Sequence, residues 1–452
     1  MIRYGGFDSE VFLSYLGEDS SVLTRLALIP GALKGRKLTQ ALDGVRILDF
    51  SRIWAGPHAT KLLADMGAEI IKVESAHAWD PHRMIIGSGN MPGGERGPDP
   101  WNRSGWFNTL HQSKYGITPD IRHPEGKAIL EELVSVSDVV IENFRAGALA
   151  RRGFDYETLR RLRPDIIVVS MPAFGNTGPW RDFIQYGIGQ EQLGGISSMN
   201  GYLGEDGPVK SGVNFGDPIS GAHAAGAVLS ALWRRRRTGK GGFIDVSQLE
   251  SSVSVMGEHI VGYQMDGTLP QNRGNRHPTH APHGAYRCQG EDRWITIAVT
   301  SDAEWRRLCE VMEMPELTQN EKFSALLARH RNQDDLNSII SEWTSDKDAI
   351  ELMGLLQDNG IAAAPVMSGE DIFNDPHYQE RGLLELVDHP SAGTYFLPGI
   401  AWKMSRTPGQ VRWPSPTLGQ HNAFIFGHLL GMSAQAISQL NEDGVTGTEP
   451  AY

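Results

Sequence analysis

The chain has 452 residues, of which 40% are hydrophobic and 21% are charged, and its formal net charge is −12. This composition is typical of a globular protein of two or three domains, and it argues against disorder and against non-specific nucleic-acid binding. Without an apolar run near the roughly 18 residues that span a bilayer, without a secretory signal and with only two cysteines, we expect a cytoplasmic, non-membrane protein that has no metal site.

Residues 1–42 mix short apolar pieces with acids, and we interpret them as an N-terminal extension. The next stretch predicts a strand over 45–50, a helix over 57–66 and a strand over 69–74. Both predicted strands are continuous apolar runs, as in buried parallel strands. This βαβ unit opens a large α/β domain that we place at 43–262, although it lacks the glycine fingerprint of a dinucleotide site.

A segment rich in Gly and Pro over 86–102 predicts a long surface loop. The pattern then predicts a helix over 124–136, a strand over 138–142, a helix over 155–162 and a strand over 166–170. Strands that alternate with helices in this way favour a parallel sheet. A lone lysine in an apolar strand, Lys72, is expected to pair with a nearby acid.

Donor side chains collect directly after the predicted strand 138–142. Asn143, Arg145, Arg151 and Arg152 all fall in the segment ENFRAGALARRGF. Ligands of open α/β sheets bind at the carboxyl ends of the strands, so this segment is a candidate binding site. A solvated basic turn explains the same charges equally well.

The sequence Asp217-Pro218 opens a predicted helix that runs to about Arg236. An Asp at the cap can accept hydrogen bonds from free backbone N–H groups, and Pro is well suited to the first helical position. The positive end of the helix favours a negative charge, so we expect Asp217 to be ionised and able to attack an electrophile. Spacing alone, however, favours an ordinary capping residue.

Beyond a strand predicted at 243–246, an irregular stretch indicates a domain boundary. Residues 263–372 then combine strands and helices, which predicts a smaller α+β domain. Residues 373–452 predict short strands and a final helix.

Taken together and in order, several blocks of this sequence resemble the family III CoA-transferases, which include the formyl-CoA, carnitine and bile-acid CoA-transferases. The blocks are residues 44–74, 123–154, 173–180 (AFGNTGPW), 216–250 and 414–421 (PSPTLGQH). The resemblance extends over about 43–432. It implies a Rossmann-like large domain formed by both chain ends, with 373–452 returning to it, and an interlocked homodimer.

The resemblance also implies a chemistry. Asp217 would attack an acyl-CoA donor, form a mixed anhydride and then an aspartyl-CoA thioester, and pass CoA to a carboxylic acid acceptor. CoA thioesters would be substrates, with no tightly bound cofactor. The CoA-binding positions would be Ala55, Arg122, Asn143, Phe144, Arg151 and Arg152, and the substrate-pocket positions Trp54, Tyr186 and His280.

This chain departs from formyl-CoA transferase near the expected site. Trp54 replaces a glutamine, which indicates a larger or more apolar acid. Gly187 replaces an acid, and GNRHPTHAPHG, residues 274–284, replaces a glycine-rich flap. Two alternatives remain: an α-methylacyl-CoA racemase type, which needs a histidine that Gln185-Tyr186-Gly187 lacks, and a subunit of a heteromeric, benzylsuccinate-type transferase.

Overall fold

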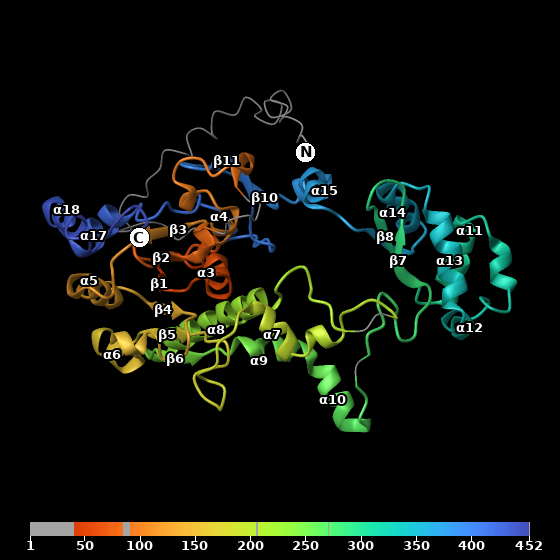
Figure 1. Ribbon diagram of the computed structural model, residues 1–452, viewed down its shortest axis with the longest axis horizontal. Helices are drawn as coiled ribbons and strands as arrows, with labels where there is room; N and C mark the ends of the chain where they lie inside the picture. Colours follow the sequence, from red (N-terminus) through yellow and green to blue (C-terminus); the bar gives the residue numbers. More distant parts are fainter. Residues whose placement is uncertain (1–39, 85–90, 205–206, 270, 452) are drawn as a thin grey trace. The chain divides into compact units, whose positions relative to one another are not determined.

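A computed structural model describes residues 40–84, 91–204, 207–269 and 271–451 (Figure 1). The expected N-terminal extension therefore lies outside the described residues except at its last three positions. The expected loop over 86–102 is described only from Met91, where two short 3-10 turns interrupt it.

A six-stranded parallel sheet organises the larger body, with the strand order β3-β2-β1-β4-β5-β6. The chain moves outward from β1 to β3 and then returns to pair β4 with the other side of β1. Such a change of direction leaves a crevice at the carboxyl ends of the two central strands, where ligands bind in open sheets. The strands are β1 Arg46–Asp49, β2 Glu69–Val73, β3 Lys114–Ile117, β4 Val139–Glu142, β5 Ile167–Ser170 and β6 Gly242–Asp245.

Helices cover both faces of this sheet, because successive strand side chains point to opposite sides. Leu48 and Val140 share one core with helices from the middle and from the end of the chain. Ile47 and Val139 share the other core with α3 and α8. The helices of the first face are α5 Pro124–Ser135, α6 Tyr156–Leu162, α17 Asn422–Leu430 and α18 Ala434–Glu442, and those of the second are α3 Ala55–Asp65 and α8 Gly216–Thr238.

Both chain ends thus build one α/β core, which confirms the expected fold class. The strand β3 and the preceding helix α4 (Gly105–Leu110) were not predicted from the sequence. The reason is that β3 begins with Lys114, whose charged side chain is fully buried, so the strand has no continuous apolar run. Where one final helix was expected, the chain forms α17 and α18.

A smaller α+β body has its own apolar core, as predicted. Its antiparallel sheet has the order β7-β8-β9, and a separate hairpin pairs β10 with β11.

Within the described residues, no helix is both long and apolar enough to cross a membrane. The remaining elements are α7 Gly187–Leu193, α9 Gln248–Val253, α10 Gly257–Asp266, β7 His283–Arg287, β8 Trp294–Ala298, α11 Asp302–Val311, α12 Leu326–Arg331, α13 Gln333–Thr344, α14 Ala349–Asp358, β9 Ala362–Pro365, α15 Gly369–Asn374, α16 Pro376–Glu380, β10 Leu384–His389 and β11 Gly393–Pro398.

Candidate functional site

Asp217 lies in the first turn of α8, and its carboxylate is nearly buried, with the residue 7% exposed. The prediction that Asp217 caps the helix is wrong, because α8 begins at Gly216 and Phe215 occupies the cap position. The carboxylate instead accepts a hydrogen bond from the backbone N–H of Ala55, at the start of α3. Two residues expected at the site are therefore in direct contact.

Asp217 was expected to be held ionised by the helix end, and its burial acts against that effect. Burial raises the pKa of Asp217 to about 6, the hydrogen bond from Ala55 opposes the rise, and the negative charge of Glu191 adds to it. Desolvation therefore outweighs the helix end. At neutral pH the carboxylate remains mostly ionised, and it is more basic than an exposed aspartate.

Glycines allow the close packing around this carboxylate. A Cβ atom placed on Gly187, the first residue of α7, would lie 1.8 Å from Oδ2 of Asp217. On α8, a Cβ atom at Gly221 would lie 2.6 Å from the backbone oxygen of Ala55. The helices α3 and α8 therefore meet at backbone distance, and this brings the Ala55 N–H to the carboxylate.

The turn between β1 and α3 has an unusual backbone. Ile53 has a φ of 67°, which is strained for a β-branched residue. Its N–H donates to both carboxylate oxygens of Asp80 at 3.3 Å. The Asn143 side chain donates to the carbonyl of Arg52 and accepts from its N–H, each at 2.8 Å. Asp80 and Asn143 thus hold the turn that presents Ala55.

Buried charged side chains also hold this turn in place. Lys72 forms an ion pair with Asp80 at 3.4 Å and donates to the carbonyl of Ser51, which confirms that this lysine pairs with an acid. The ring of His111 lies 3.6 Å from the same Asp80 carboxylate. Burial alone would raise the pKa of Asp80, but the Lys72 ammonium and His111 bring it well below its usual value.

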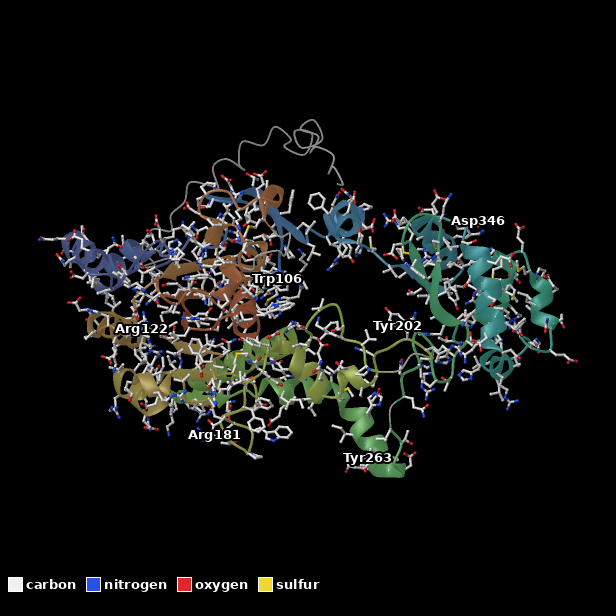
Figure 2. All side chains as sticks on the ribbon, in the orientation of Figure 1. Trp106, Arg122, Arg181, Tyr202, Tyr263 and Asp346 are labelled. Carbon is white, nitrogen blue, oxygen red and sulfur yellow. The ribbon has the colours of Figure 1, made fainter. Side chains whose placement is uncertain are left out.

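Five of the six predicted CoA-binding residues follow the carboxyl ends of β3 and β4, and the sixth, Ala55, follows β1. Phe144 lies next to the turn, with the guanidinium carbon of Arg52 5.5 Å from its ring centre. Arg151 and Arg152 follow in a 3-10 turn and are exposed. Arg122, near α5 in Figure 2, lies after β3 and forms an ion pair with Asp120.

The three predicted pocket residues belong to different elements of the structure. Trp54 packs edge-on against Trp106, with ring centres 5.0 Å apart. Tyr186 is 69% exposed and immediately precedes Gly187, so it borders the Asp217 region. His280 belongs to the smaller body, in the segment before β7, where its ring stacks on His277 at 4.4 Å.

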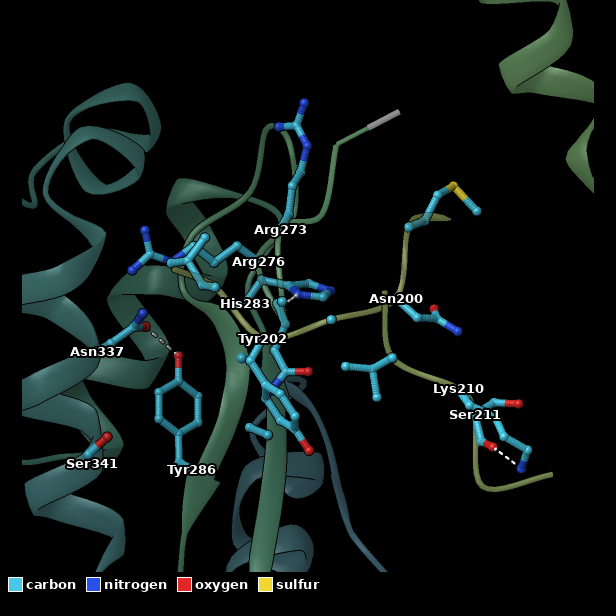
Figure 3. A pocket seen from close by; sticks show the side chains of 18 residues that line it. Asn200, Tyr202, Lys210, Ser211, Arg273, Arg276, His283, Tyr286, Asn337 and Ser341 are labelled. Carbon is cyan, nitrogen blue, oxygen red and sulfur yellow. Dashed lines mark hydrogen bonds between the residues drawn. The ribbon is translucent and has the colours of Figure 1, made fainter. Parts of the chain in front are cut away.

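A cavity of about 480 Å³ is lined by residues 199–203, residues 209–211 and the strand β7 (Figure 3). It contains the hydrogen bond from the Tyr286 hydroxyl to Asn337. Ser211 also lines it, whereas Asp217 does not. No group of three His, Cys, Asp or Glu side chains in the described part of the chain could hold a metal ion.

Sequence reasoning missed Glu191, a fully buried carboxylate on α7. It accepts hydrogen bonds from the Ser211 hydroxyl at 2.7 and 2.9 Å and from the Phe215 N–H at 2.5 Å. The only available signal was a single acid in the otherwise uncharged segment QYGIGQEQLGG, residues 185–195.

Comparisons with known proteins agree with this architecture. The model of CoA-transferase family III matches residues 42–422. The chain is 34% identical to the succinyl-CoA–D-citramalate CoA-transferase of Chloroflexus aurantiacus over 90% of this chain and 98% of that protein. It is also 34% identical to the succinate–glutarate CoA-transferase of Agrobacterium fabrum, over 86% and 95%. A solved CaiB/BaiF family protein from Brucella suis matches with a TM-score of 0.78 at 32% identity, covering 87% of this chain and 100% of that one.

Proposed function

Because the chain belongs to family III of the CoA-transferases, we propose that it transfers CoA between carboxylic acids through a thioester on Asp217. The observation that carries this proposal is the state of the Asp217 carboxyl group. It is nearly buried, its pKa is raised to about 6, and a backbone N–H holds it in place. A desolvated, mostly ionised carboxylate of raised basicity is an activated nucleophile.

The proposed reaction proceeds through two kinds of acyl intermediate. An Asp217 oxygen attacks the thioester carbon of the donor and expels CoA thiolate, which leaves a mixed anhydride. The thiolate then attacks the Asp217 carbonyl carbon and releases the donor acid, which leaves an aspartyl-CoA thioester. The acceptor carboxylate reverses both steps: it forms a second anhydride and expels the thiolate, which attacks the acceptor's acyl carbon and restores Asp217.

The Ala55 N–H has a defined part in these steps. It already donates to the carboxylate, so it can stay hydrogen-bonded to the same oxygen when negative charge develops there during attack of the thiolate on the Asp217 carbonyl. Fixed backbone donors aimed at such a charge are worth about 10²- to 10³-fold in rate. The strained turn at Ile53 would hold this donor ready before substrate arrives.

Dicarboxylic acids are the proposed substrate class. The two similar enzymes are named for succinyl-CoA with D-citramalate and for succinate with glutarate. We propose succinyl-CoA as donor and a dicarboxylic acid as acceptor. Trp54 and Tyr186 would border the acyl group. His280 belongs to the smaller body, so it would contact the acyl group only where the smaller body of a chain reaches this site.

For CoA itself, we propose the carboxyl ends of β3 and β4. Arg151, Arg152 and Arg122 are the cations that would meet its phosphates, and Phe144 would offer an apolar face. Asn143 and Ala55 would contribute through the turn that they fix, since both Asn143 side-chain polar atoms already bind Arg52.

We further propose a cytoplasmic homodimer in which 43–262 and 373–452 form the large domain and 263–372 the small one. Helix α10 supports the dimer, because none of its residues is buried although it carries Ile260, Val261, Tyr263 and Met265 (Figure 2). Exposed apolar helix faces of this kind mark protein interfaces.

Mass spectrometry tests the nucleophile. After the protein is mixed with succinyl-CoA, we expect CoA attached to the peptide that contains Asp217, and hydroxylamine should remove it. Asp217→Ala should carry no adduct and should lose at least about 10³-fold in transfer rate, because nucleophilic catalysis has no substitute for this group. Deuterium exchange at the acyl α-carbon without an adduct would instead indicate a racemase. Turnover that appears only with a second gene product would indicate a heteromer.

A further inference from the structure

Glu191 is a buried acid beside the proposed nucleophile. It lies four residues after Gly187 on α7, and residues four apart share a helix face. That face is the one against which the Asp217 carboxylate packs. The Glu191 residue is fully buried, and its charge acts directly on the carboxyl group of Asp217.

Glu191 also anchors the chain that leads into α8. Its carboxylate accepts from the Ser211 hydroxyl at 2.7 and 2.9 Å and from the backbone N–H of Phe215 at 2.5 Å. Phe215 is the cap residue of α8, two positions before Asp217. A single side chain therefore ties the segment 211–215 to α7 and fixes where α8 starts.

The groups that donate hydrogen bonds to the Glu191 carboxylate, a hydroxyl and a backbone amide, are uncharged. On the side of α3, the Asp217 carboxylate meets the Ala55 N–H. His58 of α3 packs near Gly221, and burial lowers its pKa to about 4, so it brings no positive charge at neutral pH.

We propose that Glu191 is a positioning residue for Asp217, because it fixes the start of α8 and lies on the face of α7 against which the nucleophile packs. This inference rests on the proposed function. A more basic carboxylate attacks a thioester faster, provided that it is ionised at the working pH. Gly187, one helical turn before Glu191 on α7, leaves room for the Asp217 carboxylate.

The test is the pH dependence of adduct formation in a single turnover with succinyl-CoA. In the unmodified protein the rate should fall as the pH drops below about 6, where Asp217 becomes protonated. Glu191→Gln keeps an oxygen for Ser211 and Phe215 but removes the charge. We expect its acid limb to move down by at least about half a pH unit and its rate at pH 8 to fall about 3- to 10-fold.

Ser211→Ala is the matched control, because it removes one hydrogen bond to Glu191 and leaves the charge. Its acid limb should stay where it is in the unmodified protein. If Glu191→Gln forms the adduct with an unmoved acid limb, the inference is wrong. If the unmodified protein forms no adduct, the proposed function fails instead.

Thermal unfolding of each variant shows whether it folds. If Glu191→Gln does not fold, Glu191→Asp is the variant to test. It keeps the carboxylate, but its shorter side chain moves that group away from Ser211 and Phe215. That variant should form the adduct more slowly with an unmoved acid limb. A rate equal to that of the unmodified protein would overturn the positioning role.

Discussion

The packing of Gly187 against Asp217 gives the sharpest prediction. In Gly187→Ala the new Cβ would lie 1.8 Å from Oδ2 of Asp217, 2.9 Å from its Cγ and 3.0 Å from Cβ of Asn214. Ordinary contact begins at about 3.4 Å, so the carboxylate must retreat by about 1.6 Å or α7 must move by as much. Either displacement moves the Asp217 carboxylate away from the Ala55 N–H.

A misplacement of about 1 Å near reacting atoms can cost about 10²-fold in rate. We therefore expect Gly187→Ala to form the aspartyl-CoA adduct at least about 10²-fold more slowly in a single turnover with succinyl-CoA. Its free energy of unfolding, measured with urea, should fall by about 1–3 kcal/mol, which is typical of overpacking.

Gly354→Ala is the control, because Gly354 lies within helix α14 and a Cβ atom there meets no atom within 4 Å. It should keep the rate of adduct formation and gain about 0.5–1 kcal/mol from the better helix propensity of Ala. A Gly187→Ala protein that reacts as fast as this control would refute the geometry described for Asp217.

Three further predictions concern charge and assembly. Asp80→Asn should cost about 3–5 kcal/mol in urea unfolding, because it leaves Lys72 buried without its anion; a loss below about 1 kcal/mol would contradict this. Burial raises the pKa of Glu142 from 4.5 to about 7. The protonated Glu142 therefore stabilises the folded protein below pH 4.5, and this stabilisation is lost as the pH rises through 7. Between pH 4 and pH 8, the free energy of unfolding of Glu142→Gln should therefore rise by up to about 3 kcal/mol relative to that of the unmodified protein. Unfolding of both proteins at both pH values measures this change, and an equal difference at the two pH values would exclude the effect. Val261→Asp on α10 should shift the mass measured by light scattering from twice the 49.7 kDa chain mass toward one chain, and an unchanged mass would remove α10 from the proposed interface.

The sequence predicted the strands that contain several consecutive apolar residues, including β2 with its buried Lys72, but it missed β3. The βαβ unit from β1 to β2 followed from continuous apolar runs. In contrast, β3 contains Lys114, which donates to Thr60 and pairs with Asp49 in the interior, and no periodicity reveals such a partner. Burial of charge becomes visible only when strands distant in sequence are placed side by side.

The candidate site was predicted in the same uneven way. Asp217 was found through the helix start and the resemblance, but its cap role was misjudged and its raised pKa was not foreseen, because local rules do not include desolvation by α3 and α7. Glu191 carries no motif, since its partners Ser211 and Phe215 are 20 and 24 residues away in the chain. His280 belongs to the smaller body, and the spacing of residues in the sequence does not relate that body to Asp217.

The helices α17 and α18 also constrain how the protein can be made. Ile425, Phe426 and Leu440 belong to the same core as strand β1, near the other end of the chain. During synthesis, part of one face of the larger body's sheet therefore stays uncovered until residues 422–442 have left the ribosome, whereas the smaller body, complete by Pro365, can close earlier. A nascent chain of this kind exposes apolar surface for much of its translation, which favours chaperone binding to that face.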